Sequence, residues 1–159
     1  MNFLTWAITF IIAATPYAVT RLVFRLPLTW RRVVDYFPII AGALYPIARF
    51  LPEPHITAES ITLVQHFVGG GFVSALYFFF LLYKSRSTRS LLHQFAGLYF
   101  FTSGMGVANE LLEFCATKLG LYKLDSSDVW WDLLANTLGA FVLFTIISLF
   151  FRPTSVKKA

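Results

Sequence analysis

Five long apolar runs, separated by short polar or basic loops, dominate this chain. Each run is long enough to cross roughly 30 Å of hydrocarbon as a helix rising about 1.5 Å per residue. In lipid we expect helices, because an isolated strand would leave its backbone groups without partners. The sequence therefore predicts an all-α, polytopic transmembrane bundle with one membrane domain over residues 1–159. The predicted spans cover about residues 3–20, 33–51, 60–83, 93–117 and 129–151.

The composition excludes several other classes of protein. Only 13% of the residues are charged, whereas a soluble domain has about 25%. Disorder, collagen and a coiled coil are also excluded. The single cysteine, Cys115, permits neither an intramolecular disulfide nor a cysteine-based metal site. The net charge is +5, but the basic residues lie in loops between apolar runs, so they indicate membrane orientation and not binding to nucleic acid.

The loop charges predict the orientation of the spans. Three of the thirteen Lys and Arg residues fall on one predicted side, at Arg49, Lys118 and Lys123. The other ten fall on the opposite side, at Arg21, Arg25, Arg31, Arg32, Lys84, Arg86, Arg89, Arg152, Lys157 and Lys158. By the positive-inside rule the N-terminus is outside and the C-terminus is cytoplasmic. If the second run did not span, this segregation would be lost, so five spans of an inner-membrane protein are predicted.

Polar side chains inside or next to the last four runs are the candidate site residues. They are Arg49, His66, Asn109, Glu110, Glu113, Asp128, Asp132 and Asn136. Ionisable groups inside a membrane are costly and mark functional sites. With alternating spans, most of these groups fall roughly 5–10 Å below the outer surface. We therefore expect one polar pocket that opens to the outer leaflet.

The chemistry of that pocket depends mainly on its carboxylates. Glu110 and Glu113 lie one helical turn apart and share a face. Together with Asp132 and His66 they are candidate ligands for Mg²⁺, Mn²⁺ or Zn²⁺, or a carboxylate pair for acid–base work. Arg49 is the expected charge partner of these acids. Asp128 is equally well explained as the N-cap of the fifth helix.

Three segments together resemble YjdF-type bacterial inner-membrane proteins and the broader VanZ-like group. The segments are His66-Phe67-x-Gly69-Gly70, Asn109-Glu110-Leu111-Leu112-Glu113-Phe114 and Asp128-x-Trp130-Trp131-Asp132-x-x-x-Asn136-x-x-Gly139-Ala140. The resemblance covers about residues 60–140. It implies a small polytopic membrane protein without a settled chemistry. The association of VanZ with low-level teicoplanin resistance implies a role in the cell envelope.

Three functions remain open from the sequence. The first is a site for an envelope lipid headgroup or a cation. The second is a structural or assembly protein whose polar cluster locks the helices, and the third is a small proton-coupled transporter. The sequence contains no His-Glu-x-x-His, no Gly-x-Ser-x-Gly and no cysteine in a reactive setting. It therefore favours a role other than that of an enzyme. The lipid bilayer is the expected partner.

Overall fold

The structure is a computed structural model of this chain. In the residues that the model describes, all regular secondary structure is helical. The described residues are 10–11, 13–15, 17–23, 25, 32–53, 62–85, 89–121 and 129–150. Five α-helices lie in this part: α2 (Phe37–Ala48), α3 (Leu63–His66), α4 (Val73–Lys84), α5 (Leu91–Lys118) and α6 (Val129–Phe150). A 3₁₀ turn, η2 (Val33–Tyr36), precedes α2, and two π-helical segments are η1 (Val19–Val23) and η3 (Phe67–Phe72). The all-α prediction is confirmed.

The helix bounds agree best with the third and fifth predicted runs. The elements α3, η3 and α4 form one helix over Leu63–Lys84, and α6 covers Val129–Phe150. Both helices are long and apolar enough to cross a membrane. The fourth run is also one helix, α5, although its polar second half makes it less apolar overall.

The second run forms a shorter helix than predicted. It is helical over Val33–Ala48, which is roughly 24 Å at about 1.5 Å per residue. Pro38 lies in the first turn of α2, where its missing N–H needs no partner. Pro46 lies inside the helix. Half of the first predicted run, residues 3–9, 12 and 16, lies outside the described residues.

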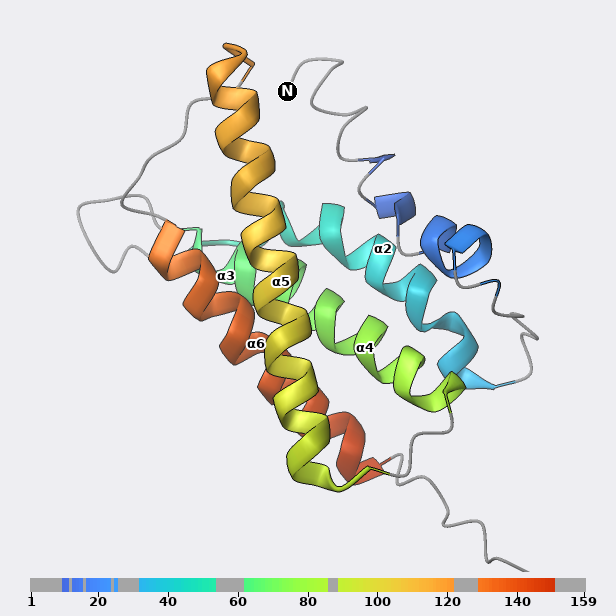
Figure 1. Cartoon of the computed structure of the whole chain (residues 1–159). Coiled ribbons are helices and arrows are strands. Elements are labelled where there is room, and N and C mark those ends of the chain that lie inside the picture. The colour runs from blue at the N-terminus through green and yellow to red at the C-terminus, as the bar shows by residue number, and fades with distance from the viewer. Residues whose placement is uncertain are drawn as a thin grey trace, which may run out of the picture.

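Neighbouring helices along the chain run in opposite directions (Figure 1). Lys84 at the end of α4 contacts Asp35 at the start of the second run, while Gly69 packs against Ala48 at the end of α2. The helix Leu63–Lys84 is therefore antiparallel to α2. We call the end of the bundle near Lys84 the Lys84 end and the opposite end the His66 end.

The last two helices continue this alternation. Asp132 contacts His66 and Phe144 packs on Phe79, so α6 runs parallel to the helix Leu63–Lys84. Phe95 packs on Phe144 at one end of α5, and Gly106 lies against Leu133 further along. The helix α5 is therefore antiparallel to α6, and its C-terminal part extends past the first turn of α6 (Figure 1).

Aromatic side chains fill the centre of the bundle. Phe80 and Phe144 are fully buried, and the rings of Phe79 and Phe95 pack around Phe144 at centroid distances of 5.9 and 5.2 Å. Such ring pairs add stability beyond the area that they bury. This aromatic core lies between the two ends of the molecule and holds α4, α5 and α6 together.

Glycines bring η3 and α6 into backbone contact. A Cβ on Gly139 would overlap the carbonyl oxygen of Phe67, and a Cβ on Gly70 would overlap Oδ1 of Asn136. A Cβ on Gly71 would lie 2.8 Å from Cα of Gly139. Small residues at helix crossings allow this close approach. The crossing sets the rotation of α6 and thereby the direction of its polar side chains.

The surface of the bundle is apolar, and several polar groups lie inside it. Exposed side chains include Phe50 just after α2, Phe100 on α5, and Trp130 and Phe150 at the two ends of α6. The buried polar residues are Thr20, Asp35, Ser74, Thr102, Asp132 and Asn136. This distribution is the reverse of that in a soluble protein, where exposed apolar area is limited and charged residues face water.

Candidate functional site

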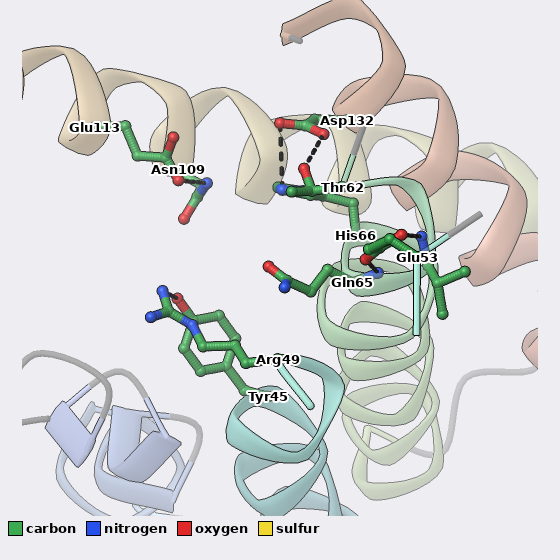
Figure 2. Close-up of polar contacts among 10 residues, drawn as sticks. Tyr45, Arg49, Glu53, Thr62, Gln65, His66, Asn109, Glu113 and Asp132 are labelled. Atoms are coloured by element: carbon green, nitrogen blue, oxygen red, sulfur yellow. Dashed lines mark hydrogen bonds and ion pairs between the residues drawn. The ribbon is translucent and has the colours of Figure 1, made fainter. Parts of the chain in front are cut away.

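A buried carboxylate contact joins α3 to α6 at the His66 end. Nε2 of His66 lies 3.2 Å from Oδ2 of Asp132, whose residue is only 4% exposed. The hydroxyl of Thr62 donates to Oδ1 of Asp132 at 3.2 Å. Figure 2 shows these three side chains meeting at the first turn of each helix. Both carboxylate oxygens therefore have partners, as a buried charge requires.

The N-terminus of α3 is capped by an acid from the end of the preceding segment. Glu53 accepts hydrogen bonds from the backbone N–H groups of Val64 at 2.8 Å and Gln65 at 2.7 Å (Figure 2). These are two of the N–H groups that a helix leaves unsatisfied in its first turn. The negative charge also lies favourably at the positive end of the helix. Glu53 thus holds the segment that follows α2 against the start of α3.

Two of the predicted acids lie on α5 near this level. The side chain of Asn109 donates to Oε1 of Glu113 at 3.0 Å, along the same helix face. The carboxylate oxygens of Glu110 are shielded from solvent. Because Gly106 lies beside Asn136 and the helices are antiparallel, Glu110 falls at the level of Asp132. Glu113 falls about one turn further out.

Asn136 lies one turn deeper than Asp132, on the same face of α6. It is 5% exposed, and its amide packs between Gly70 of η3 and Gly106 of α5. Among the described residues its Oδ1 accepts no conventional hydrogen bond. The close approach of Oδ1 to the Gly70 backbone matches the weak Cα–H···O contacts found at helix crossings. Asn136 is therefore a packing residue next to the site.

Arg49 does not pair with the acids as we predicted. It follows the last residue of α2, and its guanidinium lies over the ring of Tyr45, one turn earlier, at 5.6 Å from the centroid. Its Nη2 donates to the Tyr45 hydroxyl at 3.5 Å. Within the described residues Arg49 forms no ion pair. Asp132 contacts His66 and Thr62 instead of Arg49.

The predicted metal ligands do not assemble. His66 and Asp132 are in contact, but no group of three or more His, Cys, Asp or Glu side chains in the described residues could hold a metal ion. The candidate ligands His66, Asp132, Glu110 and Glu113 are thus not gathered into such a group in this part of the chain. Asp128 lies outside the described residues.

Several contacts at the two ends were not predicted from the sequence. At the His66 end these involve Thr62, Glu53 and Tyr45. At the Lys84 end, Nζ of Lys84 lies 2.5 Å from Oδ1 of Asp35, which is fully buried. The sequence signal for this pair was present, because Asp35 is an acid within an apolar run and such an acid needs a cation.

No family model, curated protein or solved structure matches this chain. The resemblance to YjdF-type and VanZ-like proteins therefore stays a prediction.

Proposed function

We propose that this chain is a five-span protein of the bacterial inner membrane, with its N-terminus outside and its C-terminus cytoplasmic. Three observations support the proposal. Two helices are long and apolar enough to cross a membrane, large apolar side chains cover the outside of the bundle, and the described helices alternate in direction as the loop charges predict. The short helix Val33–Ala48 and α5 are then the second and fourth spans.

We further propose that the His66 end binds the headgroup of an envelope lipid. The observation that carries this is the gathering of polar side chains from α2, α3, α5 and α6 at one end of the bundle. They are Arg49, Gln65, His66, Asn109, Glu113 and Asp132 (Figure 2). We call them the His66-end cluster. Trp130 and Trp131 are exposed at the start of α6, which is the depth at which tryptophans favour the membrane interface.

Native mass spectrometry of the purified protein tests this proposal. The wild type is expected to retain lipid when released from mild detergent, and Gln65→Leu with Asn109→Leu is expected to retain less. Thr145→Val is the matched control. Thr145 is exposed on α6 far from the cluster, and among the described residues it donates to the Phe141 carbonyl of its own helix. Equal lipid retention by all three proteins would contradict a headgroup site in the cluster.

A structural role is the second candidate, and one contact favours it. The bonds from Thr62 and His66 to Asp132 fasten α3 to α6. In that case loss of Asp132 lowers stability without any ligand being involved. The proton-coupled transporter gains no support from the described residues, because the fully buried Phe80 and Phe144 fill the bundle between its two ends.

A further inference from the structure

The carboxylates of Asp132 and Glu113 in the His66-end cluster already contact donor groups of the protein. Asp132 contacts His66 and accepts from Thr62, and Glu113 accepts from Asn109. Beside the cluster, Glu53 accepts two backbone N–H groups at the N-terminus of α3. A bound cation would have to compete with these donors for the same oxygens.

Hydrogen-bond donors remain available at the same end. Arg49 is exposed, and in the described part of the chain its guanidinium contacts only Tyr45. The side-chain amide of Gln65 makes no hydrogen bond to any described residue, although its backbone N–H is bonded to Glu53. Figure 2 shows the side-chain ends of Arg49, Gln65 and Asn109 turned toward one another from α2, α3 and α5. A guanidinium has five N–H donors, and most of those on Arg49 have no acceptor among the described residues.

We infer that the ligand of this cluster is anionic, and that Arg49 recognises its phosphate. This inference rests on the proposed headgroup site and names the chemical class of its ligand. A planar guanidinium binds phosphate oxygens with two parallel N–H bonds, and it loses its hydration more easily than an ammonium group. The Tyr45 ring supports one face of the guanidinium and leaves its edge for the phosphate. The Gln65 amide adds neutral donors beside it.

Titration of the purified protein with defined probes tests the inference. The probes are phosphatidylglycerol, phosphatidylcholine and inorganic phosphate, and binding is read by native mass spectrometry and by the shift in melting temperature. We expect the wild type to prefer phosphatidylglycerol. Arg49→Gln should weaken that binding about tenfold or more, as expected on losing a charge-assisted hydrogen bond, and Gln65→Leu should weaken it less.

Lys118→Gln is the matched control for charge. Lys118 is an exposed cation beyond the cluster on α5, and it lies over the Phe114 ring at 5.3 Å from the centroid. The Lys118→Gln variant should bind phosphatidylglycerol like the wild type. The anion inference would be overturned if Arg49→Gln bound phosphatidylglycerol as tightly as the wild type, or if the wild type bound phosphatidylcholine as tightly as phosphatidylglycerol. Either result would leave the headgroup proposal intact. If the wild type retained no lipid but bound inorganic phosphate, the headgroup proposal would be overturned and the anion site would be supported.

Discussion

Asp132 shows how one polar residue can be stable inside an apolar bundle. Its two carboxylate oxygens reach the hydroxyl of Thr62 and the imidazole of His66, both on the neighbouring helix. Removing one partner of a buried pair costs more than the pair contributes, because the other partner stays buried without compensation. The effect of a substitution at this position therefore reports on the contact between α3 and α6.

Asp132→Ala is expected to lower the free energy of unfolding by about 3 kcal/mol, because it leaves Thr62 and His66 without their shared acceptor. Asp132→Asn keeps an acceptor oxygen and should cost less. Unfolding by SDS in mixed micelles measures both changes. Thr145→Val is the control, since Thr145 bonds to the Phe141 carbonyl on its own helix. An unchanged unfolding midpoint for Asp132→Ala would show that the contact does not hold the two helices together.

At the scale of elements, the π-helical segment η3 affects which neighbouring helix each polar residue of the helix Leu63–Lys84 contacts. His66 contacts Asp132 on α6, whereas Tyr77, further along the same helix, lies 3.0 Å from the Thr20 hydroxyl of η1. In ordinary helical spacing His66 and Tyr77 share a face. The wider turn of a π-helix changes that register, and π-helical turns occur often at functional sites. The glycines of η3 also permit the backbone contact with α6.

Gly139→Ala is expected to lower the free energy of unfolding by about 1–3 kcal/mol, because the new methyl group would overlap the Phe67 carbonyl. Gly104→Ala is the matched control within α5, where a Cβ would meet no atom within 4 Å. It should be neutral or gain up to about 1 kcal/mol from its better helix propensity. Thermal or SDS unfolding measures both, and equal behaviour of the two variants would rule out a tight crossing at Gly139.

The short helix Val33–Ala48 contains a buried acid, Asp35, whose cation comes from α4. Lys84→Met is expected to destabilise the protein by about 3–5 kcal/mol, because it leaves the fully buried Asp35 without its cation. The double variant Asp35→Asn with Lys84→Met should recover much of that loss, since it removes both charges. SDS unfolding of the single and double variants measures the coupling. A double variant no more stable than Lys84→Met would contradict the proposed pairing.

At the scale of the whole molecule, the alternating helices separate two kinds of polar end. The Lys84 end holds the Asp35 ion pair and a contact between Arg32 and the Tyr83 hydroxyl. The His66 end holds the cluster proposed to meet lipid headgroups. The apolar surface between the ends provides the area that would face lipid.

Reporter fusions test the proposed topology. Fusions at residue 159 and within residues 85–89 should both report a cytoplasmic location, because ten of the thirteen Lys and Arg residues lie on that predicted side. A fusion within residues 54–60 should report the opposite side. A periplasmic signal from the 85–89 fusion would exclude the five-span arrangement.

The sequence by itself determined the helices and the residues that needed partners. Hydrophobicity is a local sum, so the apolar runs predicted the helices Leu63–Lys84 and Val129–Phe150 to within a few residues. The cost of polar groups in lipid marked His66 and Asp132, and the spacing of the runs placed them near one level. Only the tertiary structure decided the pairings: Asp132 with His66 and not with Arg49, and Asp35 with Lys84. A pairing depends on the rotation and register of two helices. For Asp132 and His66 these are set by the π-helical turn and the glycine crossing of η3 with α6. Both pairings join residues far apart in the chain, so no local pattern specifies them.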